Sequence, residues 1–235
     1  ETAGVVVAND IDINSTIGTG VATVGGSSAL TTGTVSFTGN VVLRDLLPAV
    51  QEPQTLRVSS ETNDGSGVSF SGVISESDGG GLASNDVLSL IKTGNGRVTF
   101  LGANIYGGDT TVSAGTLFAN NSSGSATGSG TVHVEAGGTL AGVGFIGGDV
   151  MLAGAVANPA NLSPGDPEIA GGIGTLTLNQ DLTLGQDSSV WFTIMGDNLN
   201  DKIIAATLSA DTSTLFNVLF DSSYTPQLGD TFDLF

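Results

Sequence analysis

The chain has 235 residues, of which 39% are hydrophobic and only 12% charged, so it has the composition of a folded protein rather than a disordered one. Five basic residues stand against 23 acidic ones, which gives a net charge of −18 and argues against nucleic-acid binding and against attachment to anionic membranes. The absence of cysteine excludes disulfides, thiolate metal sites and thiol catalysis, and 36 glycines without a Gly-x-y period exclude collagen.

Short runs that alternate between apolar and polar residues follow one another along the chain, whereas long runs with a 3.6-residue period are missing. This pattern predicts β-strands with one packed and one solvated face. The apolar window Leu140–Ala157 is interrupted by Asp149 and by glycines, so we expect buried strands there and no membrane insertion. The runs, in chain order, are Thr34–Gly39, Thr55–Ser60, Gly67–Ser75, Arg97–Gly102, Thr131–Gly137 and Gly174–Gly185.

Related short units recur along the chain. The unit S/E-A-G-(G)-T-L occurs at Ser113–Ala119 and Glu135–Gly142, with a relative at Gly172–Leu178, and the unit G-G-D-x-x-(V/L) occurs at Gly107–Val112 and Gly147–Leu152. A period near 20 residues with inserted loops is typical of a solenoid, in which each coil covers the apolar side of its neighbour. Glycine, asparagine and aspartate tolerate the positive φ angles that sharp corners need.

These features predict an all-β fold, a right-handed parallel β-helix or closely related β-solenoid of about ten coils. We expect one continuous domain with three parts, 1–86, 87–189 and 190–235. Residues 190–235 are richer in large apolar side chains, which leaves open a sandwich-like C-terminal cap. Prolines interrupt the pattern at 44–53 and 157–172, where we expect excursions from the stack, and 120–130 reads as a polar loop. The chain opens at Glu1 rather than Met, as expected of a processed or trimmed segment.

The stretch from Ile91 to Val150 resembles the autotransporter-associated β-strand repeat family. The resemblance is good over 87–235, where it includes LSPGDP at 162–167 and QLGDTFDLF at 227–235. Over 1–86 it is limited to the general pattern of short alternating runs and does not include the motif. It implies a secreted bacterial β-solenoid of the kind that forms the stalks of surface passengers. The residues at the motif positions are Lys92, Gly94, Gly96, Gly102, Asn104, Tyr106, Gly108, Thr110, Val112, Gly115 and Leu117.

Oxygen-rich segments are the first candidates for chemistry. Asp10 and Asp12 alternate along a strand and should share a face, as a solvated pair or as a catalytic or metal pair. Asn198–Asp201 and Asn63–Gly67 offer oxygen ligands but lack the spacing of known calcium loops, so loop turns are the favoured interpretation. We therefore assign no metal-binding residues and no cofactor, with Ca²⁺ as a weak alternative.

Single residues are the second candidates. His133 is the only histidine, and the alternation of its strand points it outward, so a surface role is favoured over a catalytic base. Trp191 is a candidate sugar platform, although a buried or interface aromatic is favoured. The sequence shows no compact cluster of acids with Arg, Lys or His, so we assign no catalytic residues and predict that the chain is not an enzyme.

The favoured function is a non-catalytic structural protein outside a bacterial cell: a surface stalk, a matrix component or a self-assembling filament subunit. Exposed strand edges at Val5–Ile13 and at the C-terminal TFDLF favour head-to-tail self-association. The alternative is an adhesin or carbohydrate-binding module that contacts surface glycans through Trp191, Tyr106 or the loops at 44–53 and 157–172. A polysaccharide lyase is the third hypothesis.

Overall fold

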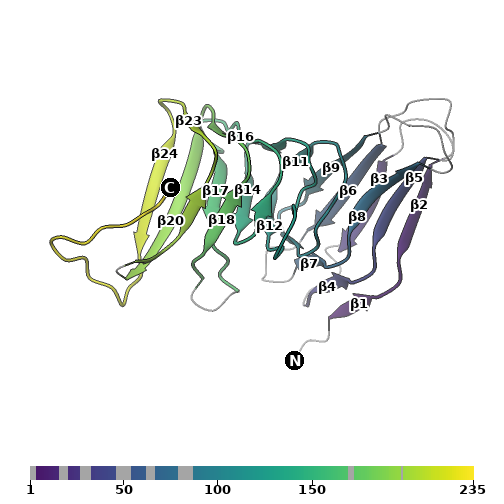
Figure 1. Cartoon of the computed structure of the whole chain (residues 1–235), viewed down its shortest axis with the longest axis horizontal. Coiled ribbons are helices and arrows are strands. Elements are labelled where there is room, and N and C mark those ends of the chain that lie inside the picture. Colours follow the sequence, from purple (N-terminus) through teal and green to yellow (C-terminus); the bar gives the residue numbers. More distant parts are fainter. Residues whose placement is uncertain are drawn as a thin grey trace.

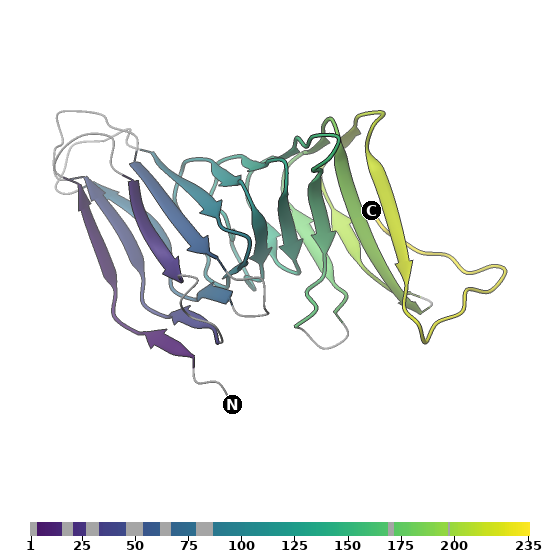
Figure 2. The ribbon, with the colours of Figure 1, turned by 180° about the vertical axis from the view of Figure 1, so that it is seen from behind.

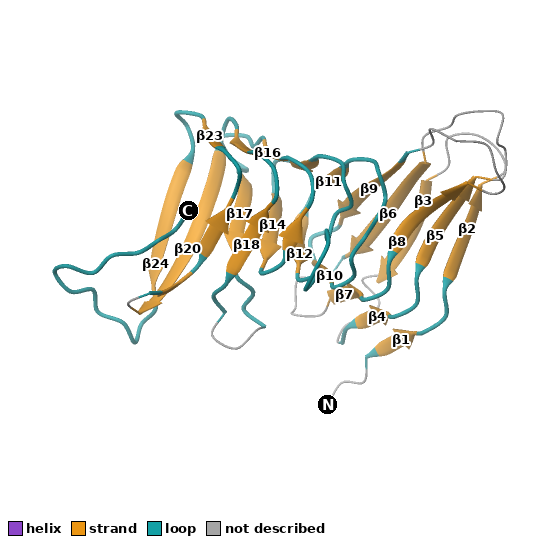
Figure 3. Ribbon diagram, viewed as in Figure 1, coloured by secondary structure: helices purple, strands orange, loops and turns teal. Residues whose placement is uncertain are grey.

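The computed structural model describes residues 4–15, 21–26, 33–45, 54–61, 67–78, 87–168, 172–196 and 198–235. These residues form an elongated stack of strands, and no helix occurs among them, so none is present that could span a membrane (Figures 1 and 3). The strands pair in parallel, apart from the small β20–β21 hairpin and two isolated bridges. The predicted all-β solenoid is therefore confirmed. Its right-handedness stays a prediction from the general handedness of parallel crossovers.

Each coil contributes strands to up to three faces of the stack. The first face is a ten-stranded sheet, the third face is an eight-stranded sheet, and the second face consists of two three-stranded sheets. The first face contains β1 (Val5–Val7), β4 (Val35–Phe37), β7 (Gly67–Phe70), β10 (Arg97–Phe100), β12 (Gly115–Ala119), β14 (Gly138–Gly142), β17 (Ala160–Pro164), β20 (Ser188–Gly196), β21 (Leu199–Asn200) and β24 (Leu215–Phe220).

The second face contains β2 (Ile11–Ser15), β5 (Val41–Asp45), β8 (Ile74–Asp78), β15 (Phe145–Ile146), β18 (Thr175–Leu178) and β22 (Lys202–Ile204). The third face contains β3 (Val21–Gly26), β6 (Gln54–Ser60), β9 (Leu88–Thr93), β11 (Thr110–Val112), β13 (Val132–Val134), β16 (Val150–Leu152), β19 (Leu182–Leu184) and β23 (Leu208–Ala210). Seen from behind, the strands of successive coils again lie side by side along the stack (Figure 2).

The core consists of ladders of like residues that point inward from successive coils. On the first face Val98, Leu117 and Leu140 are in register and fully buried, and Leu162 and Val190 continue the ladder. A second ladder carries phenylalanines: the rings of Phe37 and Phe70 stack with centroids 4.9 Å apart. Each buried Leu or Phe contributes roughly 2 kcal/mol of hydrophobic free energy, and only the neighbouring coils supply the apolar surface that covers it.

Backbone hydrogen bonds bridge the second face where it lacks regular strands. The Ile105 amide donates to the Ile74 carbonyl over 3.1 Å, and the Ala126 amide donates to the Phe145 carbonyl over 2.8 Å. The loops of these middle coils therefore continue the stack between β8 and β15.

The coils differ in length along the stack. A hydrogen bond between neighbouring coils joins residues 33 apart at Asn40 and Val73 but 22 apart at Ser113 and Glu135. The repeat of about 20 residues thus describes the middle of the chain, whereas the N-terminal coils are longer. The eight-stranded third face accordingly contains fewer coils than the ten expected from the sequence.

The C-terminal residues continue the stack. β24 pairs in parallel with β20, and the Ile203 amide donates to the Leu234 carbonyl over 2.9 Å, which adds one more rung beside β22. Leu215, at 61% exposure, and its neighbours are open to solvent because no further described coil covers them. Within the described residues, the end of the chain therefore extends the solenoid and does not form the sandwich-like cap that the sequence left open.

Pairing also runs across both expected part boundaries, since β6 pairs with β9 and β17 pairs with β20. The division at residues 86 and 189 itself stays a prediction. The excursion expected at 44–53 lies mostly outside the described residues, because only its first two residues, at the end of β5, are placed.

Candidate functional site

The polar residues of the repeat motif lie inside the stack, where they stabilise corners. Lys92 occupies an inward position between Val58 and Val112 and is fully buried. Its Nζ donates hydrogen bonds to the carbonyls of Thr93, Gly94 and Ala114 over 2.7–3.0 Å, which ties one corner to the next coil. Burial lowers the pKa of the Lys92 ammonium to about 8, against the opposing effect of the Glu61 charge.

Asn104 performs a similar bridging role on the second face. Its Oδ1 accepts a hydrogen bond from the Ile74 amide over 2.8 Å, and its Nδ2 donates to the Ala126 carbonyl over 2.6 Å. The side chain is 3% exposed, so water cannot replace these bonds. One side chain therefore joins three successive coils.

Tyr106 does not form the sugar platform that the adhesin hypothesis included. The ring is fully buried, and its hydroxyl lies 2.7 Å from the Thr110 hydroxyl. Burial raises the pKa of the Tyr106 phenol despite the hydrogen bond to Thr110, which keeps the group neutral in the core. The prediction of a glycan contact at Tyr106 is therefore wrong, because the ring packs inside the stack.

The first acidic pair does not act as a unit. Asp10 Oδ1 accepts from the Asn40 amide over 2.7 Å, whereas Asp12 pairs with the guanidinium of Arg44 over 3.2 Å. Both carboxylates thus bind neighbouring-coil groups on the exposed second face, in agreement with the favoured solvated interpretation.

The second acidic candidate, Asn198–Asp201, contains a buried carboxylate. Asp201 accepts from the amides of Gly174 and Thr193 over 2.9 and 2.8 Å. Burial raises the pKa of Asp201, although these hydrogen bonds oppose the change. Asn198 adopts a positive φ of 57° in the turn between β20 and β21. This segment is therefore a turn at Asn198 followed by β21, while residues 63–66 of the third candidate lie outside the described residues.

His133 points outward from β13, as the alternation of its strand predicts. Its Nε2 lies 3.6 Å from Asp109 Oδ2, and both side chains are about half exposed, at 42% and 57%. Among the described residues, no serine hydroxyl forms a hydrogen bond with it. Trp191 also points outward, is 38% exposed, and donates a long hydrogen bond of 3.4 Å from its indole to Asn161 Oδ1.

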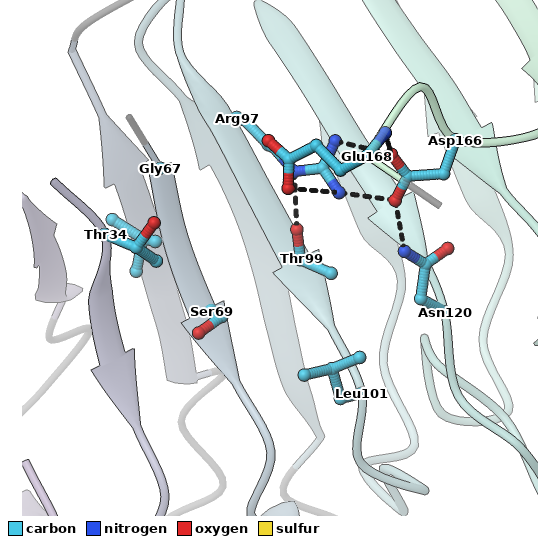
Figure 4. A pocket seen from close by; sticks show the side chains of 10 residues that line it. Thr34, Gly67, Ser69, Arg97, Thr99, Leu101, Asn120, Asp166 and Glu168 are labelled. Carbon is cyan, nitrogen blue, oxygen red and sulfur yellow. Dashed lines mark hydrogen bonds and ion pairs between the residues drawn. The ribbon is translucent and has the colours of Figure 1, made fainter. Parts of the chain in front are cut away.

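The excursion expected at 157–172 is wrong for Ala160–Pro164, which form β17 inside the first face, and the turn that follows at 165–168 builds a polar cluster on the outer surface of this face. Here the guanidinium of Arg97 donates two hydrogen bonds to the Asp166 carboxylate in a bidentate ion pair, with N–O distances of 2.9 and 2.5 Å (Figure 4). Asn120 donates to the same carboxylate over 2.5 Å, and the Glu168 amide donates to it over 2.9 Å. Asp166 is 1% exposed in this arrangement.

Arg97 is held on every side. Its Nε donates to the Thr99 hydroxyl over 3.0 Å, and its Nη2 lies 3.5 Å from a Glu168 oxygen. Its guanidinium carbon lies 3.6 Å from the centre of the Phe118 ring, in a cation–π contact. Burial alone would raise the pKa of Asp166, but the hydrogen bonds from Arg97, Glu168 and Asn120 and the charge of Arg97 together lower it.

This cluster borders a groove of about 360 Å³ on the outer surface of β4, β7 and β10, which we call the Arg97 groove. It is lined by Thr34, Gly67, Val68, Ser69, Arg97, Thr99, Leu101, Asn120, Asp166 and Glu168. On the other side of the loop lies a second hollow of about 380 Å³, with Phe118, Ala141, Pro164 and Pro167 among its lining residues.

The sequence shows no compact cluster of acids with a basic residue, but the fold assembles one. Arg97 and Asp166 are 69 residues apart in the chain, and three coils of stacking bring them together. The only local signal was the proline-rich sequence around Asp166, whose turn directly follows β17. Among the described residues, no group of three or more His, Asp or Glu side chains is placed to hold a metal ion.

Comparison with known proteins agrees with this architecture. Residues 90–117 match the passenger-associated-transport-repeat family. The chain is 37% identical over 136 residues to the adhesin BmaC autotransporter of Brucella suis biovar 1 (strain 1330), a match that covers 53% of this chain and 4% of the adhesin. It is 34% identical over 125 residues to an extracellular serine protease of Serratia marcescens, covering 52% of this chain and 10% of the protease.

These matches span only a small part of either relative, so they show what the repeats are and not what the whole relatives do. The matched segment 90–117 contains Lys92 and Asn104, whose side chains fasten neighbouring coils to one another, and the buried Tyr106. Residues 90–117 therefore carry the repeat of autotransporter passengers that the sequence motif predicts.

Proposed function

We propose that this chain is a non-catalytic stalk segment of a bacterial surface or secreted protein, a spacer that holds other parts away from the cell. The observation that carries this proposal is the use made of the polar motif residues. The side chains of Lys92 and Asn104 bond one coil to the next, and both residues are buried, as is Tyr106. The similarity to autotransporter passengers supports a location outside the cell.

The chemistry of the Arg97–Asp166 cluster supports the absence of catalysis. A glycosidase acid needs a raised pKa, but the pKa of Asp166 is lowered and its carboxylate is locked to Arg97. A lyase needs a basic side chain free to take a proton, whereas Arg97 is engaged on all sides. The protease relative does not change this proposal, because His133 is bonded to no serine among the described residues.

Imaging and activity assays of the purified chain test the proposal directly. We expect rods in negative-stain images, no cleavage of casein, and no rise in uronate absorbance with polygalacturonate and Ca²⁺. Reproducible turnover that co-purifies with the folded chain would overturn the non-catalytic assignment. Globular particles would overturn the stalk.

We further propose self-association of coils end to end. β24 leaves one strand edge unpaired among the described residues, and β1 leaves another, with Val6 64% exposed. Unpaired edges accept further parallel strands, from another coil or another copy of the chain. Light scattering over a hundredfold range of concentration tests this. A mass that stays monomeric throughout would contradict assembly of this segment by itself.

A second candidate function is an adhesive module, since one relative is named an adhesin. The observation that favours it is the Arg97 groove, a hollow of about 360 Å³ that the pre-organised Arg97–Asp166 pair borders. Trp191, as a half-exposed aromatic, remains a candidate contact for a glycan on this face.

A further inference from the structure

The wall of the Arg97 groove is built more firmly than the stack requires. The inward ladders already hold the coils together, including β17, yet the turn at 165–168 that follows β17 is fastened in addition by the bidentate Arg97–Asp166 pair. Asn120 and the Glu168 amide complete the bonds to that carboxylate. Groups held in this way are pre-organised, so a ligand that contacts them loses little conformational entropy on their account.

The floor of the groove offers hydroxyls at regular intervals. Ser69 and Thr99 are in register on β7 and β10 and line the groove, one strand spacing of about 4.8 Å apart. The Ser69 hydroxyl donates to Ser36 and can still accept, and the Thr99 hydroxyl, 7% exposed, accepts from Arg97 and can still donate. Thr34 lines the groove one coil earlier. A hydroxyl both donates and accepts, so this row can bond to a ligand that itself presents hydroxyls along its length.

Charge limits the ligand. Arg97 is neutralised by Asp166, and Glu168, which is 58% exposed, leaves the rim with a net negative charge. The chain as a whole carries a charge of −18. An anionic ligand would meet repulsion without a free guanidinium to bind it, which excludes uronates, sialylated glycans and phosphates.

Leu101 adds an apolar contact. It is 45% exposed at the end of the groove and follows Thr99 by two residues, directly after β10 (Figure 4). A pyranose ring has an apolar face of C–H groups and a rim of hydroxyls, which matches an exposed Leu beside a hydroxyl row.

We infer that the Arg97 groove is a binding site for a neutral oligosaccharide. The sugar hydroxyls bond to the Ser69 and Thr99 hydroxyls and to the Glu168 carboxylate. The apolar face of one ring lies on Leu101. The Arg97–Asp166 pair fixes the wall and does not contact a charged ligand group.

The test uses the purified chain with defined hexasaccharides. Cellohexaose, maltohexaose, mannohexaose and N-acetylchitohexaose are the neutral probes, and hexagalacturonate is the anionic one. Saturation-transfer NMR detects weak binding, and isothermal titration measures affinity. We expect saturable binding of at least one neutral hexasaccharide and none of hexagalacturonate.

Two variants locate the site. Ser69→Trp fills the groove and should abolish binding, while Ser209→Trp places the same side chain on the outer surface of the third face and should leave binding intact. Glu168→Gln should weaken binding about tenfold, because a charge-assisted hydrogen bond becomes a neutral one. Circular dichroism confirms that each variant is folded.

The inference is overturned if no neutral hexasaccharide binds the wild-type chain. It is equally overturned if binding survives in folded Ser69→Trp, or if hexagalacturonate binds more tightly than every neutral probe.

Discussion

Asn104 offers the most direct test of how the coils are fastened. Its amide accepts from Ile74 on one side and donates to Ala126 on the other, within a buried corner. Replacing Asn104 with Ala leaves one backbone donor and one backbone acceptor buried without a partner. We therefore expect Asn104→Ala to destabilise the chain strongly.

The magnitude follows from those two bonds. Each unsatisfied buried group costs about 1–3 kcal/mol, so the variant should lose roughly 2–6 kcal/mol of unfolding free energy. Asn40 provides a matched control, because its Oδ1 accepts from the Val73 amide over 2.9 Å in the same way but at an exposed corner. Water can replace that bond, and Asn40→Ala should lose only about 0.5–1 kcal/mol.

Urea unfolding followed by far-ultraviolet circular dichroism measures the difference. Hydrogen exchange gives a local readout that does not depend on two-state unfolding, which stacked repeats often violate. We expect the Ile74 amide to lose protection in Asn104→Ala and to keep it in Asn40→Ala. Equal losses of stability in the two variants would refute the bridging role of the buried amide.

The remaining predictions concern charge and corners. The pKa of Lys92 falls from 10.5 to about 8 on folding, so between these values the unfolded state holds more protons and the free energy of unfolding should rise with pH. From pH 7 to 9.5 the gain is about 2 kcal/mol. Urea midpoints of the Lys92→Met variant should lack this increase with pH. Asp166→Asn should lose about 3 kcal/mol of unfolding free energy at pH 7. Because folding lowers the pKa of the wild-type Asp166 carboxyl, this difference from wild type should shrink as acid protonates that carboxyl. The same difference at pH 2.5 would contradict the ion-pair account. Gly142, with φ of 124°, lies against the Ala119 carbonyl, so Gly142→Ala should cost several times the roughly 1 kcal/mol or less of Gly196→Ala in thermal melts. Carboxylate repulsion at a net charge of −18 predicts a higher melting temperature with Ca²⁺, and an unchanged value would remove that idea.

Alternation and corner residues made the solenoid predictable. The runs around Val98 and Leu117 place every second side chain on one face, and the structure buries those side chains in register. The positions of the motif were also recognised from sequence. Their burial was not, because Lys92, Asn104 and Tyr106 are residue types that usually lie at the surface or at an interface. Only the stacking of neighbouring carbonyls around them explains why they are inside.

The groove could not be predicted, because it depends on contacts between distant coils. Arg97 belongs to an ordinary alternating strand, and Asp166 lies in a proline-rich loop 69 residues later. Their meeting depends on the lengths of the intervening coils, which the repeat pattern defines only approximately. The longer N-terminal coils show the same limit, since the period read from the middle of the chain does not hold there.

The stacking itself can be tested by engineered disulfides, since the chain contains no cysteine. Thr116 and Thr139 are in register on adjacent parallel strands, about 4.8 Å apart, which suits a disulfide, whereas Thr116 and Asn161 are two strands apart. We expect the double variant Thr116→Cys with Thr139→Cys to form an intramolecular disulfide on mild oxidation, detected by mass spectrometry of its peptides. Thr116→Cys with Asn161→Cys should remain reduced. The reverse pattern, or equal cross-linking of both pairs, would contradict the stacked coils.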